Sequence, residues 1–254
     1  MRKLAPGVYE AERAATGFSY VVKLEPPAVP SEAAHVSWLS SDHGVLMLGD
    51  ILPLSSGAVR LQMVLPPGWS SYSAESRITA NEYGVPDAGD ALLIIGHELR
   101  ERRGRADSIE FTFVAQGRWA FSDADVATAI KSILEEHEEA VGNTPTVRPT
   151  IILAPFPVPV SHSMWSAETR GRTVFFLSGH SPSKTAGLAQ LSVPLTHELF
   201  HLWVPNSLAL DGEYDWFYEG FTLYHALRAG VRLGHLSFQD YLYAMGRAFD
   251  GYKA

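Results

Sequence analysis

Thr196-His197-Glu198-Leu199-Phe200-His201-Leu202-Trp203 is the most informative stretch of this 254-residue chain, because it contains the pattern H-E-x-x-H. Ser192 is a suitable cap for a helix, so we expect a helix over 193–204. Residues four positions apart on a helix share one face and lie about 6 Å apart along the axis, so both imidazoles can reach one ion. The pattern therefore predicts a metal site with His197 and His201 as ligands.

The remaining positions of this helix have distinct expected roles. Glu198 is offset by about 100° from His197 around the axis, so its carboxylate would lie beside the ion rather than bind it. A carboxylate in that place can act as general base for water activated by a metal. The opposite side of the helix is apolar and can anchor it in a core through Leu195, Leu199, Leu202 and Trp203. We therefore predict Glu198 as the catalytic base.

A third metal ligand is expected from a second helix. A catalytic zinc site usually has three protein ligands and one open position. Glu219, in the segment Asp215-Trp216-Phe217-Tyr218-Glu219-Gly220, follows His201 with seventeen residues between them. We expect it near the start of a helix over 216–228, with Gly220 allowing that helix to approach the first one closely. The competing interpretation of Glu219 is an ordinary solvated carboxylate in a first helical turn.

The composition excludes several classes of function. The chain has 20 Lys and Arg against 28 Asp and Glu, a formal net charge of -8, which opposes the phosphate contacts that nucleic-acid binding requires. It has no Cys, so a metal site must use His and carboxylate ligands. Its apolar runs are far shorter than the ~20 residues that cross a bilayer, and residues 1–7 show no signal-peptide core. We expect a cytoplasmic protein with no membrane span and no nucleic-acid partner.

Turn residues and apolar periodicity divide the chain into two halves. Strands are predicted over 18–24, 35–39, 45–48, 58–65, 91–95 and 108–115. A helix capped by Ser122 is predicted to about residue 140, then strands over 148–153 and 172–177, and helices over 193–204, 216–228 and 237–249. We expect an α+β fold with a boundary near residue 120. An antiparallel β-sandwich-like domain would cover 1–120, and a domain that carries the H-E-x-x-H motif would cover 121–254.

Further residues around the motif match a known family. His197-Glu198-x-x-His201-x-Trp203 is followed by Trp216-x-x-Glu219-Gly220-Phe221-Thr222-x-Tyr224, by Arg228-Ala229-Gly230 and by Ser237-x-x-x-Tyr241-Leu242. This series resembles the glycyl aminopeptidase family of gluzincin zinc metallopeptidases, strongly over 193–243 and in outline before it. The resemblance implies a β-rich domain, then a mainly helical catalytic domain with a small edge sheet, often followed by a PDZ domain. It also implies that this chain holds only the start of the catalytic domain.

The resemblance also implies roles for the motif residues. His197, His201 and Glu219 would bind one Zn²⁺, and Glu198 would be the general base for hydrolysis of a peptide substrate. The family uses a transition-state donor further along the chain, for which the sequence leaves several candidates open. These are Tyr214, Tyr218, Tyr224, Tyr241 and Tyr243.

One more residue is implied to contact the substrate. Glu168, in Glu168-Thr169-Arg170-Gly171-Arg172, is similar in position to a family Glu that meets the amino terminus of the substrate near an edge strand. The Gly-Gly-Leu that precedes this Glu in the family is Trp165-Ser166-Ala167 here. The competing interpretation of Glu168 is an exposed loop carboxylate.

Three functions stay open from the sequence. The first is a zinc-dependent, aminopeptidase-like peptidase. The second is a catalytically weak or inactive peptide-binding or scaffold module that contains zinc. The third is a globular domain in which H-E-x-x-H arose by chance. Metal content and turnover of peptides with free and blocked amino termini would separate them.

Overall fold

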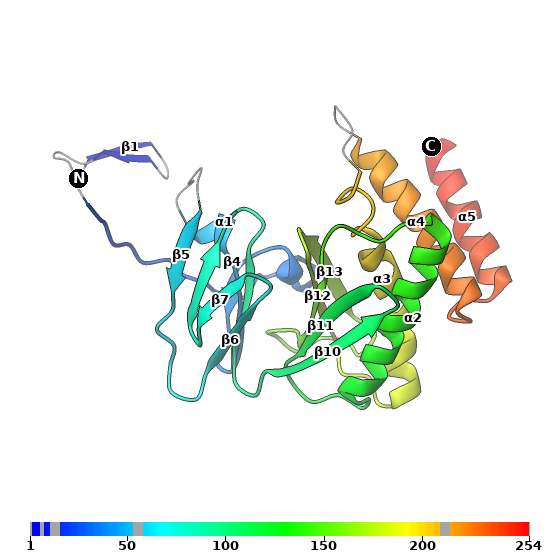
Figure 1. Cartoon of the computed structure of the whole chain (residues 1–254), viewed down its shortest axis with the longest axis horizontal. Helices are drawn as coiled ribbons and strands as arrows, with labels where there is room; N and C mark the ends of the chain where they lie inside the picture. The colour runs from blue at the N-terminus through cyan, green and yellow to red at the C-terminus, as the bar shows by residue number, and fades with distance from the viewer. Residues whose placement is uncertain (1, 6–7, 11–15, 53–57, 209–213, 254) are drawn as a thin grey trace.

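The computed structural model describes residues 2–5, 8–10, 16–52, 58–208 and 214–253. Its described parts form three successive layers, in which antiparallel strands of the first half lie beside a mixed sheet, and helices cover the far face of that sheet (Figure 1). A hairpin of β1 (Arg2–Ala5) and β2 (Val8–Glu10) lies apart from these layers. None of the described helices is both long enough and apolar enough to cross a bilayer.

Besides the β1–β2 hairpin, the described part of the first half forms two antiparallel sheets. One has the order β3 (Trp38–Leu39), β4 (His43–Met47), β9 (Leu92–Gly96) and β6 (Ser70–Ser73). The other has the order β5 (Val59–Gln62), β8 (Glu82–Val85) and β7 (Ser76–Thr79). Tyr83 and Val85 of the second sheet share a buried cluster with Leu93 of the first. This packing of one sheet on the other matches the sandwich-like arrangement expected for this half.

Two strand predictions in this half are wrong in detail. Residues 18–24 are extended but belong to no sheet, and Val21 is 97% exposed. Their alternation of apolar residues resembles a strand, yet the segment forms no continuous ladder with another strand. The Leu39 amide of β3 donates one hydrogen bond of 3.0 Å to the Leu24 carbonyl oxygen. The strand predicted over 35–39 shortens to β3, because Pro30–Ala34 form a 3₁₀ helix, η1, that ends at His35. A short helix α1 (Leu48–Ile51) follows β4.

A five-stranded mixed sheet forms the centre of the molecule. Its order is β10 (Arg100–Ala106), β11 (Ile109–Ala115), β12 (Thr150–Pro155), β14 (Thr173–Ser178) and β13 (Trp165–Arg170). The pairs β11–β12 and β12–β14 are parallel, and the two outer pairs are antiparallel. The expectation of a small edge sheet therefore needs correction, because the sheet is larger and includes strands from before residue 120. The strand that carries Glu168, β13, does lie at an edge.

Both faces of this sheet are buried. On β12, Ile151 and Leu153 point to the helices, whereas Ile152 and Ala154 point to the strands of the first half. A strand that is covered on both faces has a continuous apolar sequence rather than an alternating one. The division of the chain at residue 120 stays a proposal. The hydrogen-bonded pair β11–β12 joins strands from both sides of that residue.

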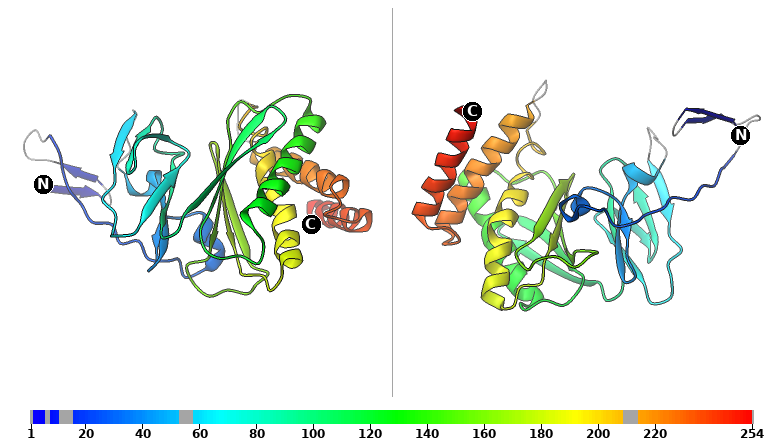
Figure 2. Two further views of the ribbon diagram at one scale, coloured as in Figure 1. Left: turned by 60° about the horizontal axis from the view of Figure 1, so that its bottom comes forward. Right: turned by 180° about the vertical axis from the view of Figure 1, so that it is seen from behind.

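Four longer helices of the described chain lie on one side of this sheet (Figure 2). They are α2 (Asp123–Val141), α3 (Lys184–Phe200), α4 (Asp215–Arg232) and α5 (Phe238–Lys253). The predicted cap of α2 is confirmed, since Ser122 and Asp125 form a reciprocal capping box. The start predicted for α3 is wrong, because the cap is Ser183, whose hydroxyl accepts a hydrogen bond from the Ala186 amide. The motif therefore lies at the C-terminal end of a longer helix.

A buried histidine ties α2 to this end of α3. The Nε2 atom of His137 donates a hydrogen bond to the Thr196 carbonyl oxygen at 2.9 Å, and the His137 ring meets Phe200 and Trp203 edge-on. Burial lowers the pKa of His137 to about 4, and nearby His225 also disfavours its charged form. Because the carbonyl oxygen can only accept a hydrogen bond, this contact requires a proton on Nε2. It raises the pKa of His137 and so acts against burial, which remains the larger effect.

We expect the stability of the zinc-free protein to fall as pH falls from about 6.5 towards 4. In this window the unfolded state takes up a proton on His137 and the folded state does not, which costs about 2 kcal/mol between pH 7.5 and pH 5. Urea unfolding at several pH values in the presence of a chelator measures this slope. His137→Gln should make the slope shallower, whereas His162→Gln, at an exposed position, should not. An unchanged slope in His137→Gln would contradict the assignment.

Candidate metal centre

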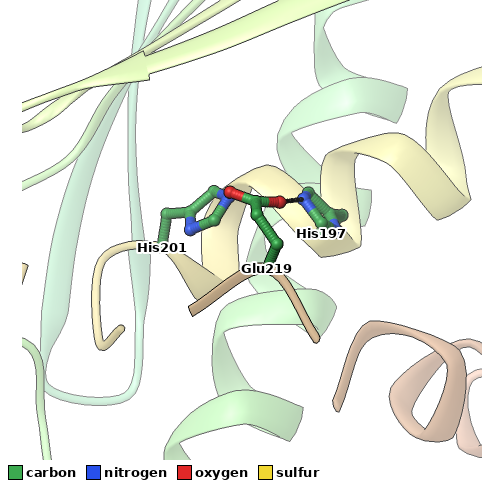
Figure 3. A group of neighbouring side chains, drawn as sticks. All are labelled: His197, His201 and Glu219. Atoms are coloured by element: carbon green, nitrogen blue, oxygen red, sulfur yellow. Dashed lines mark ion pairs between the residues drawn. The ribbon is translucent and has the colours of Figure 1, made fainter. Parts of the chain in front are cut away.

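Three side chains from two helices converge at the end of α3. His197 lies in its last turn, His201 caps it, and Glu219 comes from the start of α4. The Nε2 atom of His197 lies 3.3 Å from Glu219 Oε2, and Nε2 of His201 lies 3.6 Å from Glu219 Oε1. One ligand atom from each residue lies within 4.8 Å of the others. Figure 3 shows the Glu219 carboxylate between the two imidazole rings.

This geometry suits one zinc ion. Two atoms that each bind a tetrahedral zinc at about 2.1 Å are separated by about 3.4 Å. Each histidine nitrogen lies near this distance from a different oxygen of Glu219, at 3.3 Å and 3.6 Å, and one ligand atom from each of the three residues lies within 4.8 Å of the others. Two imidazole nitrogens with one carboxylate oxygen are also a donor set typical of catalytic rather than structural zinc. The arrangement therefore fits the ion that the motif predicts.

Neighbouring groups orient the imidazoles for this task. Nδ1 of His201 lies 2.9 Å from the Val204 carbonyl oxygen and donates a hydrogen bond to it. In the neutral ring, Nε2 therefore carries the lone pair that can bind a metal, and this atom faces Glu219. Burial lowers the pKa of His197, and the adjacent His201 acts in the same direction. A neutral imidazole is the form that binds metal.

Aromatic packing brings Glu219 to the histidines. The Phe200 ring of α3 stacks on His225 of α4 with ring centroids 4.5 Å apart, and it also meets Phe221 at 6.0 Å. These contacts hold the first turns of α4 against the end of α3. The role expected for Gly220 is wrong, since a Cβ atom at this position would meet nothing within 4 Å. Helix α4 therefore approaches α3 through aromatic rings and not through a glycine contact.

Glu198 lies beside the three converging side chains and is buried. Its Oε2 atom accepts a hydrogen bond of 2.7 Å from Thr169 Oγ1 on β13. Burial raises the pKa of the Glu198 carboxyl, whereas the bond from Thr169 acts in the opposite direction. A carboxylate with a raised pKa is a better proton acceptor than an ordinary surface Glu.

A cleft of about 390 Å³ opens over this group of side chains. Besides the three converging residues and Glu198, its wall includes Glu168 and Thr169 of β13, Asn206 and His35. Glu168 thus lies in the cleft, together with Glu198. Thr169 and His35 are not among the site residues predicted from the sequence. The position of Thr169 next to Glu168 was a usable signal, whereas no sequence signal joins His35 to residues more than a hundred positions away.

The tyrosines that the sequence leaves open as transition-state donors lie elsewhere. None of the five is among the described residues that line the cleft. Tyr218 packs on the apolar cluster beneath the helices, and Tyr214 and Tyr243 are exposed. The choice of a transition-state donor among these tyrosines stays open.

No family model matches the sequence, and no curated protein matches it. Among solved structures, the chain is similar to an aminopeptidase N family protein from Idiomarina loihiensis, with a TM-score of 0.64, 17% sequence identity, and coverage of 81% of this chain and 40% of that chain. It also aligns with an M1 zinc metallopeptidase from Deinococcus radiodurans, with a TM-score of 0.49, 14% identity, and coverage of 76% and 47%.

The likeness to the Idiomarina protein shows a shared fold. The chain spans 40% of that protein's length, so the activity of the whole protein is not transferred by the alignment. The Idiomarina protein is described as a member of the aminopeptidase N family, and this description applies to that protein. The narrower likeness to the PDZ-associated glycyl aminopeptidases stays a prediction.

Proposed function

We propose that this chain carries the catalytic centre of a zinc-dependent, aminopeptidase-like peptidase of the gluzincin type. The observation that carries the proposal is the convergence of His197, His201 and Glu219 from α3 and α4, with the buried Glu198 carboxylate beside them. The donor set and its spacing are those of catalytic zinc. The shared fold with an aminopeptidase N family protein gives separate support.

The residues around the candidate metal site have separate tasks in this proposal. His197, His201 and Glu219 would hold one Zn²⁺, which when bound lowers the pKa of water and polarises a peptide carbonyl. Glu198 accepts the proton of the attacking water and later passes it to the leaving amine. Thr169 keeps the Glu198 carboxylate turned towards the cleft through its hydrogen bond of 2.7 Å.

Glu168 is the residue that would select substrates with a free amino terminus. It lies in the same cleft as Glu198 and its charge is felt at the Glu198 carboxyl. A carboxylate in this place can pair with the ammonium group of a peptide and align the first peptide bond with the catalytic group. The proposed substrate class is therefore peptides with a free amino terminus.

We also propose a cytoplasmic location and no nucleic-acid partner.

We expect the purified chain to bind about one zinc per molecule and to hydrolyse short peptides only when zinc is present. Elemental analysis gives the metal content, and turnover is measured for one peptide with its amino terminus free and acetylated. Faster turnover of the free peptide is expected, because only its ammonium can pair with Glu168. Bound zinc without hydrolysis would instead favour a peptide-binding or scaffold module, and a chain that binds no zinc would contradict both functions.

A further inference from the structure

We propose that His35, from the first half of the chain, is a positioning residue that holds the Glu168 carboxylate in the cleft and thereby sets the preference for ligands with a free amino group. The inference rests on the proposed function, in which Glu168 receives that group. It adds a residue that neither the H-E-x-x-H motif nor the edge-strand segment contains. It also makes the preference depend on contact between the first half of the chain and β13.

The backbone that carries His35 is anchored to the sheet and to the first half. Ser166 Oγ of β13 donates a hydrogen bond of 2.6 Å to the carbonyl oxygen of Ser31 in η1. Trp38 Nε1 donates one of 2.7 Å to the Ala33 carbonyl oxygen, and the Ala33 side chain is fully buried. Because these contacts fix η1 on β13, His35 at its end has a defined place beside Glu168.

Both oxygens of the Glu168 carboxylate are engaged by neighbouring groups. Oε1 accepts a hydrogen bond of 2.9 Å from Arg170 Nε, and Oε2 meets His35 Nδ1. Two bonds to opposite oxygens prevent the carboxylate from turning about its last torsion. Each oxygen keeps a further acceptor site, so an ammonium group can still bind a carboxylate that is held in place.

His35 and Arg170 differ in what they can contribute. Arg170 lies on the same strand as Glu168, and it is not among the cleft-lining residues, whereas His35 is. Removing His35 would leave the carboxylate held only at Oε1 and free to swing towards Arg170. That swing withdraws the acceptor from a ligand ammonium while the zinc ligands stay unchanged. The effect should therefore fall on ligands with a free amine and spare those without one.

Binding of two matched ligands to the zinc-loaded full chain tests this proposal. L-alanine hydroxamate and N-acetyl-L-alanine hydroxamate share a zinc-binding group and differ in the free amine. We expect the wild-type chain to bind the free-amine ligand about tenfold more tightly, as for one charge-assisted hydrogen bond. His35→Ala should remove most of this preference by weakening the free-amine ligand alone. His35→Gln, which keeps a donor group, should retain most of it, and His162→Ala, outside the cleft, should change nothing.

Several outcomes would overturn the proposal. They are an unchanged preference in His35→Ala, an equal loss of affinity for both ligands, or a wild-type chain that shows no preference or binds neither ligand. The side chain of His35 is half exposed, so its removal should leave the melting temperature almost unchanged. Peptide turnover judges the proposed function separately. A chain that hydrolyses no peptide yet shows the selective His35 effect would refute the proposed enzyme and support the positioning role. A chain that hydrolyses peptides but keeps its ligand preference in His35→Ala would support the enzyme and refute the positioning role.

Discussion

Glu198→Gln is expected to keep zinc and lose peptide hydrolysis. The amide has nearly the same shape and can still accept the hydrogen bond of 2.7 Å that Thr169 donates to this side chain. It cannot take a proton from water at neutral pH, and general base catalysis contributes typically 10²–10⁴-fold. We therefore expect kcat to fall by at least about 100-fold, with KM and zinc content near the wild-type values. Steady-state kinetics and elemental analysis on the same preparation measure both quantities.

The chain provides a matched control for this variant. His97-Glu98 repeats the first half of the motif but lacks the second histidine, and Glu98 lies at the surface just after β9. Glu98→Gln makes the same chemical change outside the cleft and should retain full turnover. Wild-type activity in Glu198→Gln would remove Glu198 from the mechanism. Loss of zinc in that variant would show that the residue acts on metal binding and not on proton transfer.

Glu219→Gln is expected to abolish tight zinc binding. It replaces the one carboxylate of the ligand set by a neutral amide and leaves two imidazoles. Loss of a group that merely supports a ligand typically weakens metal affinity 10–100-fold, so we expect loss of a ligand to cost more than about 100-fold. The Glu219 side chain is 62% exposed, so the change should not disturb packing. Competition with a chromogenic chelator measures the affinity.

Glu135→Gln is the control for the ligand variant. Glu135 lies on α2, pairs with Lys131 and does not line the cleft, so its loss should leave zinc affinity unchanged. Thermal unfolding gives a second measurement. Zinc should raise the melting temperature of the wild type and of Glu135→Gln, because a ligand that binds only the folded state stabilises it. An equal rise in Glu219→Gln would show that Glu219 does not bind the ion.

The local elements could be predicted where sequence and surroundings favour the same structure. The capping box of Ser122 and Asp125 specifies the start of α2 within a few residues, and the apolar side of the motif helix does become core. The prediction of strands and of helix boundaries fails where the structure of a segment depends on contacts with other segments. Residues 18–24 alternate like a strand but form no ladder with one, apart from a single hydrogen bond from the Leu39 amide to the Leu24 carbonyl oxygen. Helix α3 begins earlier than predicted, and its cap is Ser183 instead of Ser192.

The residues that carry the chemistry of the candidate site can be recognised from their spacing in the sequence. The spacing of His197 and His201 places both rings on one side of any helix, and Glu198 follows by the same geometry. The partners of these residues could not be predicted in this way, because they come from segments that are distant in sequence. Aromatic packing of Phe200 on His225 brings Glu219 to the histidines, and β13 supplies Thr169 to Glu198. Contact between η1 and β13 brings His35 to Glu168. Helical periodicity is a property of one continuous segment, so the sequence of that segment is enough to predict it. The contacts between distant segments form only in the folded chain, in which the helices pack on one face of the central sheet and the first half packs on the other.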